Sequence, residues 1–358
     1  MFAPIIFLLV LGILIVIHEF GHFWVAKKIG VKVEEFSLGF GKKLLKRKKG
    51  ETEYSLSVFP LGGYVKMSGD ERAEFKGGER EYLAQAPGKR ALIVLAGPAA
   101  NYILGIICFW LIFTFGYPTF TTKVGKVLEG YGAEAVGIKA GDSILAIDNK
   151  EIKLWEELQD EILSKNKSTV EVKFKRGEEI LSVNVSLTNN EVKNILGEKK
   201  RVGMLGISPS DETVVVRHGA ITSFGLAVKK SYDLTILTYK ALWRIVSGKL
   251  SFRDSVSGPL GIYYVTTKTA SLGVGALVQL LAVLSISLAI FNLLPLPVLD
   301  GGHIFLLGIE KIRKKALNQK AELVITRIGI SLMVTLAIFA TYNDFLRIFK
   351  DKIDKFIH

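Results

Sequence analysis

The most restrictive feature of this chain is an apolar stretch near its start that contains two histidines and a carboxylate. Residues 5–26 read IIFLLVLGILIVIHEFGHFWVA, which is long and apolar enough for a membrane-spanning helix. His18 and His22 are four residues apart, so a helix places them on one face, about one turn from each other. Ionisable groups inside hydrocarbon are costly and mark a functional site. The stretch therefore predicts a spanning helix with a site built into it.

The pattern from His18 to His22 is H-E-x-x-H, which favours a metal site. Two neutral imidazoles at this spacing can bind one divalent ion, and Glu19 beside them can take a proton from a water that such an ion activates. In a soluble chain the pattern is as easily a chance occurrence. In lipid, two histidines and a carboxylate would be strongly destabilising without a partner, so we expect a bound metal here.

Composition indicates a polytopic α-helical membrane protein. The chain has 358 residues, of which 49% are hydrophobic, and a mean hydropathy of +0.34. Its apolar residues concentrate in four runs, at 5–26, 91–117, 274–294 and 323–341. We therefore expect about four transmembrane helices and one further domain of ordinary size. The net charge of +13 points to anionic lipid headgroups, because no nucleic-acid motif is present. The single cysteine, Cys108, excludes an internal disulfide framework.

The loop after the first span sets the expected topology. Residues 27–90 carry 15 Lys and Arg against 9 Asp and Glu, a net charge of +6. The positive-inside rule places this loop in the cytoplasm and the N-terminus outside. Residues 54–58 and 64–67 alternate like strands around a Pro-Gly turn. They form either a small surface hairpin or an exposed edge that pairs with an extended substrate backbone. Alternating spans place the weakly basic tail, residues 342–358, outside, which the same rule mildly disfavours.

Residues 118–210 form a polar, β-patterned segment that reads as a separate α+β domain. Strand-like runs, a short amphipathic helix at 155–163 and a hairpin at 170–187 surround the stretch AEAVGIKAGDSI. This order resembles a PDZ domain of the circularly permuted bacterial kind. The resemblance puts a peptide-carboxylate loop at Met204, Leu205, Gly206 and Ile207, beside which an extended peptide would add as a strand. A steric cap is an equally good interpretation. Residues 211–270 read as a linker with a helix at 221–249 that suits the membrane surface better than a span. A turn is expected at residues 257–262.

The third apolar run ends in NLLPLPVLDGGH, residues 292–303. Prolines and glycines break the helix, and irregular backbone at membrane depth is tolerated only where protein buries it or it lines a cavity. Asp300 then lies at a broken helix end, on the same side of the membrane as the two histidines if the spans alternate. It is the candidate third ligand, and Asn292 is a candidate for hydrogen bonding to substrate backbone. In the second apolar run, the small residues of 97–101 allow close helix packing, and Asn101 either stabilises that packing or faces the site. His303 either supports the ligands or is a plain loop residue.

HEFGH in the first span and NLLPLPVLDGGH at the end of the third, with a PDZ-like domain between, resemble the bacterial site-2 proteases of the RseP type. The resemblance covers nearly the whole chain, and residues 97–101 and 258–262 look like further signatures of the family. It implies a zinc intramembrane endopeptidase of the bacterial cytoplasmic membrane with an extracytoplasmic PDZ-like domain. Implied roles are Zn²⁺ ligation for His18, His22 and Asp300, general base for Glu19 and substrate contact for Asn292. Implied substrates are single-span membrane proteins, such as anti-sigma factors, and remnant signal peptides.

Two other classes of function fit parts of the sequence. A non-proteolytic membrane adaptor, with a PDZ module and a vestigial metal site, would keep its function after Glu19→Gln and lose it when residues 124–209 are deleted. A metal transporter would need a polar path through several spans, whereas polar groups cluster only around the two motifs. The protease accounts for more of the chain than either alternative.

Overall fold

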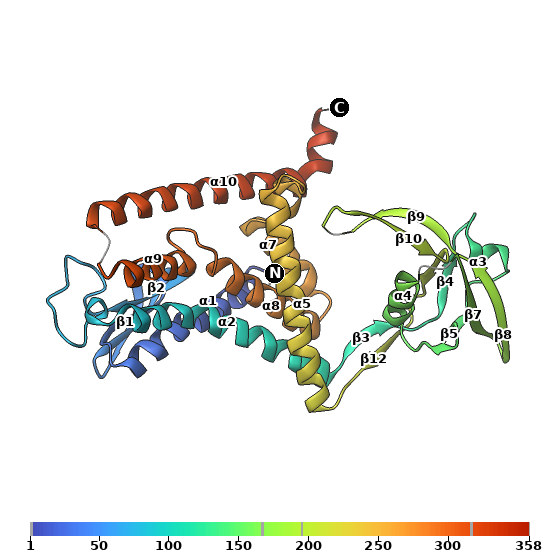
Figure 1. Ribbon diagram of the computed structural model, residues 1–358, viewed down its shortest axis with the longest axis horizontal. Coiled ribbons are helices and arrows are strands. Elements are labelled where there is room, and N and C mark those ends of the chain that lie inside the picture. Colours follow the sequence, from blue (N-terminus) through green and yellow to red (C-terminus); the bar gives the residue numbers. More distant parts are fainter. Residues whose placement is uncertain (1–2, 166–167, 195, 316–317, 358) are drawn as a thin grey trace. The chain divides into compact units, whose positions relative to one another are not determined.

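The computed structural model describes residues 3–165, 168–194, 196–315 and 318–357. The chain divides into two compact units (Figure 1). The membrane unit consists of Met1–Ile112, Ile221–Leu242 and Ser251–His358. The β-rich unit consists of Phe113–Ala220 and Trp243–Leu250.

Within the described residues, four helices are long and apolar enough to cross a membrane, which confirms the expected number. They are α1 (Ala3–Ile29), α2 (Pro87–Phe115), α8 (Val274–Asn292) and the part Leu323–Ile348 of α10 (Gln319–Ile357).

Helices α2 and α8 approach each other closely through small residues. A side chain at Gly105 of α2 would collide with Ile286 of α8, which is fully buried. One turn away, the Ser285 hydroxyl donates to the backbone carbonyl of Asn101 at 2.7 Å. Small residues and buried polar contacts are the usual means of fixing helix pairs in lipid, where a hydrophobic driving force is absent. This contact brings the end of α8 to the part of α2 that faces α1.

The loop between the first two spans is a larger structure than a small hairpin. Two long antiparallel strands, β1 (Val33–Lys49) and β2 (Thr52–Met67), fold so that one part of β1 lies between two parts of β2. Glu35 to Leu38 pair with Lys66 to Gly63 on one side and with Glu53 to Leu56 on the other. A short 3₁₀ helix, η1 (Tyr82–Ala84), follows. The end of β2 lies against α1, where a side chain at Gly63 would press on Glu19 at 3.1 Å.

Helix α5 (Ala220–Val246) has a buried face of small residues and an exposed apolar face. Ser223, Ala227 and Ser231 are fully buried. The exposed face carries Ile221, Phe224, Tyr232 and Trp243. It is not among the candidate spans in the described residues, so the expectation of a surface helix stays a prediction.

Two segments differ from the sequence-based expectation around residue 258. The expected turn there is the start of a helix, α7 (Pro259–Ala270), which follows the short helix α6 (Phe252–Ser255). Asp344, expected in a tail, is buried within α10 and accepts a hydrogen bond from the Gly261 backbone N–H at 2.7 Å. The first turn of a helix has unsatisfied N–H groups and favours a carboxylate. Because Gly258 and Gly261 have no Cβ, the carboxylate of Asp344 can approach their backbone. The sequence around residue 258 does not show that Asp344 is its partner, because the two lie far apart in the chain.

The β-rich unit has the elements expected of the PDZ-like domain. Its four-stranded sheet has the order β6-β5-β7-β8, and three further strand pairs are β3–β12, β4–β11 and β9–β10. The elements are β3 (Tyr117–Phe120), β4 (Val124–Val127), α3 (Gly132–Ala135), β5 (Ser143–Ile147), β6 (Lys150–Glu151), α4 (Trp155–Ser164), β7 (Thr169–Arg176), β8 (Glu179–Ser186), β9 (Thr188–Lys193), β10 (Lys199–Met204), β11 (Ile207–Pro209) and β12 (Thr213–Val216). Fully buried Ile144, Ile147, Val172 and Val185 form its core.

Asp142, at the end of the AEAVGIKAGD stretch, is a structural carboxylate of this unit. Arg176 donates to it from Nε at 2.8 Å and from Nη2 at 2.6 Å, and the Lys139 backbone N–H donates at 2.8 Å. Burial would raise the pKa of Asp142, but these hydrogen bonds outweigh it and hold the pKa below its usual range. The residue therefore ties the turn before β5 to the end of β7.

Candidate metal centre

Three side chains expected to bind a metal converge in the membrane unit. His18 and His22 come from α1, and Asp300 is the first residue of α9 (Asp300–Arg313). His18 Nε2 lies 3.2 Å from Asp300 Oδ2 and 3.2 Å from His22 Nε2, and His22 Nε2 lies 3.6 Å from Asp300 Oδ1. One ligand atom from each of the three lies within 4.8 Å of the others. The three side chains thus form one polar cluster, although His18 and Asp300 are 282 positions apart in the sequence.

The geometry of this cluster fits a tetrahedral metal. Two ligand atoms about 2.0–2.1 Å from a tetrahedral zinc lie about 3.3 Å from each other, close to the separations found. Asp300 Oδ2 is buried and accepts no hydrogen bond from the described part of the chain. A buried carboxylate oxygen without a donor needs a cation or water. Two imidazoles and one carboxylate leave a fourth position open, which is the arrangement of catalytic zinc sites.

Helix α2 fixes the orientation of His22. The Nδ1–H of its ring donates to the backbone carbonyl of Ile93 at 2.9 Å. A carbonyl only accepts, so in the neutral ring this bond leaves the Nε2 lone pair directed toward Asp300. A Cβ at Gly97, one turn further along α2, would collide with both histidine rings. Sequence reasoning missed Ile93 and Gly97 as supports of the site, although it noted the small residues at 97–101.

Two asparagines flank His18. Asn101 is fully buried in α2 and its Nδ2 lies 3.4 Å from His18 Nδ1. Asn292, the last residue of α8, places its Nδ2 3.4 Å from the same atom. The structure therefore brings Asn101 to the site. It also sets Asn292 beside a candidate ligand, and its expected contact with substrate stays a prediction.

Glu19 faces a cavity of about 150 Å³ that also reaches His22 and Asp300. Val65 and Met67, at the C-terminal end of β2, line this cavity as well. A carboxylate in such a cavity can exchange protons with a water held between it and the metal ligands. The structure thus places the predicted base, two predicted ligands and the end of a strand around one space.

Polar groups from the loop side line the same cavity. Burial raises the pKa of Tyr82 to about 12, so its hydroxyl is protonated at neutral pH. Burial also raises the pKa of Asp70, against the opposing hydrogen bond from the Met67 backbone N–H. Asp70 and Tyr82 also line a second, polar cavity of about 320 Å³ together with His303. The two cavities therefore adjoin, and His303 lies in helix α9 and not in a loop.

The link between α8 and α9 shows why the proline- and glycine-rich motif is needed. Val298 has a φ of +81°, a conformation that costs free energy for a β-branched residue and is found where surroundings enforce it. A Cβ at Gly301 would collide with the carbonyl of Leu293, and one at Gly302 with that of Leu296. Only glycine permits this close fold, which turns the chain so that α9 starts at Asp300.

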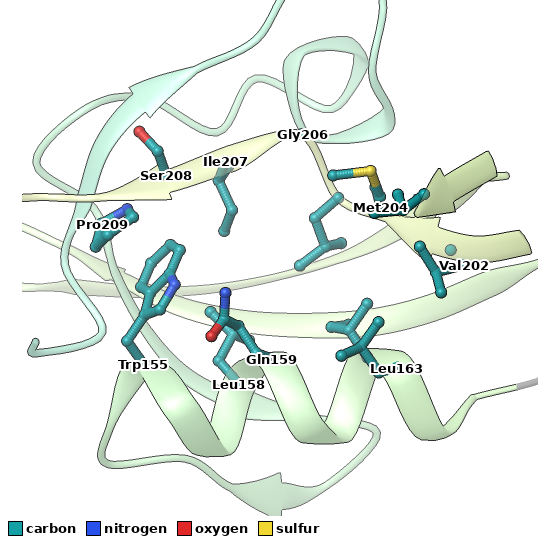
Figure 2. A pocket seen from close by; sticks show the side chains of 14 residues that line it. Trp155, Leu158, Gln159, Leu163, Val202, Met204, Gly206, Ile207, Ser208 and Pro209 are labelled. Atoms are coloured by element: carbon teal, nitrogen blue, oxygen red, sulfur yellow. The ribbon is translucent and has the colours of Figure 1, made fainter. Parts of the chain in front are cut away.

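The β-rich unit contains a groove at the residues predicted to form the peptide-carboxylate loop, shown in Figure 2. Its occupation by a peptide stays a prediction. A cavity of about 380 Å³ lies between α4 and β11, with apolar side chains on both walls. Trp155, Leu158, Gln159 and Leu163 come from α4, and Met204, Leu205, Gly206 and Ile207 close the opposite side. β11 pairs with β4 on one edge only among the described strands. Its other edge has no strand partner in the described part of the chain, and its residues Ile207, Ser208 and Pro209 line the groove, which suits strand addition.

Comparisons with known proteins agree with the predicted resemblance. The family model described as Peptidase family M50 matches residues 6–336. A Campylobacter jejuni protein named as a zinc metalloprotease is 34% identical over 344 residues, which cover 95% of this chain and 92% of the relative. The regulator of sigma-E protease RseP of Escherichia coli is 31% identical, with 96% of this chain and 98% of the relative covered.

The similar proteins of known structure match a smaller part of this chain than the relatives above do. The PDZ domain of an SdrC-like protein from Listeria innocua is 28% identical, covers 26% of this chain and 96% of that chain, and has a TM-score of 0.21. The family match, by contrast, includes the HEFGH and NLLPLPVLDGGH motifs and all of the chain except residues 1–5 and 337–358. The chain therefore belongs to peptidase family M50, as a membrane-embedded metalloendopeptidase.

Proposed function

We propose that the protein is a zinc-dependent endopeptidase that cleaves peptide bonds within the membrane, with Zn²⁺ held by His18, His22 and Asp300. The convergence of these three side chains on one point carries the proposal. When bound, zinc polarises the scissile carbonyl and lowers the pKa of an adjacent water. The buried oxygen of Asp300 fits such an ion, as does the Nε2 of His22, which keeps its lone pair when Nδ1–H donates to Ile93.

The protein's own residues supply proton transfer and orientation. Glu19 takes the proton of the attacking water and returns it to the leaving amine. Ile93 and Asn101 keep the two imidazoles in place through the contacts at 2.9 Å and 3.4 Å. The polar cavity lined by Asp70 and Tyr82 provides water with a route from the loop side.

The end of β2 provides an edge for an extended substrate. Residues Gly63 to Met67 pair with β1 on one side, while Val65 and Met67 face the cavity that holds Glu19. A substrate helix hides its carbonyls in internal hydrogen bonds, so it must unwind before attack. Strand pairing with this edge would hold the unwound segment next to Glu19, and Asn292 would hydrogen-bond its backbone on the opposite side.

We assign the protein to the cytoplasmic membrane of a bacterium, with single-span membrane proteins as substrates. The relative named regulator of sigma-E protease supports anti-sigma factors as one class, and remnant signal peptides are another. The charge of residues 27–90 supports an extracytoplasmic β-rich unit. Its groove at Met204 to Ile207 would accept a peptide C-terminus.

Cleavage of a tagged single-span reporter by purified protein in detergent with zinc tests the proposal. Glu19→Gln is expected to lower the rate about 100-fold or more, because a positioned base contributes at least that much. Val65→Pro removes a backbone donor from the edge without touching a ligand. It is expected to slow cleavage of the intact reporter while zinc binding stays at the wild-type level.

Equal cutting by wild type and Glu19→Gln would reject the role of Glu19 or reveal a contaminating protease. Zinc binding without cleavage of any reporter, together with cellular function that survives Glu19→Gln, would favour the adaptor. Loss of zinc binding in Asp300→Ala, measured by competition with a chelating dye, separates the ligand assignment from the choice of reporter.

A further inference from the structure

A buried ion pair joins the start of α2 to α9. Arg90 is 7% exposed, and its Nη2 contacts Glu310 Oε1, whose side chain is 18% exposed. Arg90 Nε also donates to the backbone carbonyl of Gln85 at 3.0 Å. A guanidinium held on two sides is a planar, pre-organised anchor. Glu310 is therefore attached to a fixed point of α2.

The two joined helices are also the ones that build the metal centre. Asp300 begins α9, and Glu310 follows ten residues later, about 15 Å further along the helix. Helix α2 holds His22 through the carbonyl of Ile93. The ion pair thus connects the helix that carries the carboxylate ligand to the helix that orients a histidine.

A hollow separates α2 from α9 beside this pair. Its volume is about 320 Å³. Arg90 and Val94 line it from α2, and His303, Leu306 and Leu307 line it from α9. Close packing of side chains normally sets the distance between neighbouring helices, and the hollow interrupts that packing here. We therefore expect the ion pair between Arg90 and Glu310 to set the distance between α2 and α9 here.

We propose that Arg90 and Glu310 are positioning residues that act as a strut, setting the place of Asp300 relative to His18 and His22. This inference rests on the proposed zinc site, to which it adds residues that touch neither metal nor substrate. Glu310→Gln keeps the size of the side chain and removes its charge, so α9 loses its anchor and Asp300 its fixed position. Loss of such an outer support typically weakens metal affinity by about 10- to 100-fold.

The test measures zinc affinity of the full-length protein in detergent by competition with a chelating dye. Glu310→Gln and Arg90→Gln are expected to weaken zinc binding at least about 10-fold. Arg90→Lys keeps the charge opposite Glu310 but lacks the planar fork that also reaches Gln85, so it is expected to recover part of that loss. The matched control is Glu51→Gln, which removes the exposed ion pair between Glu51 and Arg80 in the loop and is expected to leave zinc affinity unchanged.

The visible spectrum of the Co²⁺-substituted protein gives a second readout, because it reports ligand geometry. Changed spectra in Glu310→Gln and Arg90→Gln, with thermal unfolding close to wild type, support the strut. Wild-type affinity and spectra in both variants overturn it, as does an equal loss in Arg90→Lys and Arg90→Gln. If Glu310→Gln does not fold, the comparison of the two Arg90 variants decides. Failure of the proposed function is distinct, since Asp300→Ala would then leave zinc binding intact.

Discussion

At the scale of single residues, the candidate metal centre depends on the absence of a side chain at Gly97. The rings of His18 and His22 occupy the space in which a Cβ at Gly97 would lie. The same face of α2 carries the carbonyl of Ile93, which orients His22. Because the backbone of α2 must come this close for that hydrogen bond to form, ring position and helix distance are set together.

Gly97→Ala is expected to displace both rings and to lower zinc affinity and proteolysis about 10-fold or more. Overpacking of this kind costs about 1–3 kcal/mol of stability. Zinc competition and reporter cleavage measure the effect. Gly88→Ala is the matched control, because it lies in the same helix with open space around its Cβ position. Wild-type zinc affinity in Gly97→Ala would mean that the rings occupy another position.

Local sequence predicts the candidate metal ligands better than the residues of α2 that hold them in place. The helical repeat places His18 beside His22, and the prolines and glycines before Asp300 indicate a broken helix end. The structure brings all three together. The roles of Ile93 and Gly97 depend on which face of α2 meets α1, and that is a property of packing between distant segments. The small residues at 97–101 indicated close packing without naming the partner.

At the scale of elements, the groove between α4 and β11 presents an apolar channel with one free strand edge. Trp155, Leu158 and Leu163 line one wall, and the loop at Met204 to Gly206 closes the other side. Strand addition supplies affinity through backbone hydrogen bonds, and apolar pockets select side chains. We therefore expect preference for peptides that end in an apolar residue with a free carboxylate.

A fluorescent peptide of that kind is expected to bind the purified full-length protein, as measured by polarisation. Leu163→Glu places a like charge near the peptide carboxylate and is expected to weaken binding at least about 10-fold, since the lost apolar burial and the repulsion add. Asp160→Asn, an exposed change on the same helix that does not line the groove, is expected to have no effect. Equal binding of an amide-terminated peptide, or no binding by wild type, would favour a steric cap.

Elements with a strong local pattern were predicted from sequence, and those fixed by distant partners were not. The four spans and the helix at 155–163 follow from hydropathy and periodicity, and the structure contains them. The start of helix α7 was expected as a turn at residues 257–262. Local sequence could not show that this start is fixed by Asp344 from α10. Within residues 27–90 only two short strand-like runs were expected, at 54–58 and 64–67, since the charged run at residues 42–49 hides the strand pattern of β1.

At the scale of the whole molecule, charge and span number together fix the expected orientation in the membrane. The loop of residues 27–90, with net charge +6, belongs in the cytoplasm by the positive-inside rule. The β-rich unit follows the second span and is therefore expected on the other side. The candidate metal site would then open to the cytoplasmic side, because its cavity is lined by Asp70 and Tyr82 of this loop.

Single-cysteine variants test this orientation cleanly because Cys108 is the one native cysteine and is buried. In a Cys108→Ala background, Lys48→Cys marks the loop and Glu178→Cys marks the turn between β7 and β8, both exposed positions. A membrane-impermeant maleimide applied to spheroplasts is expected to label Glu178→Cys at once and Lys48→Cys only after lysis. The reverse pattern would invert the topology and move the opening of the metal site to the outer side, where the substrate's cytoplasmic half would no longer reach the edge of β2.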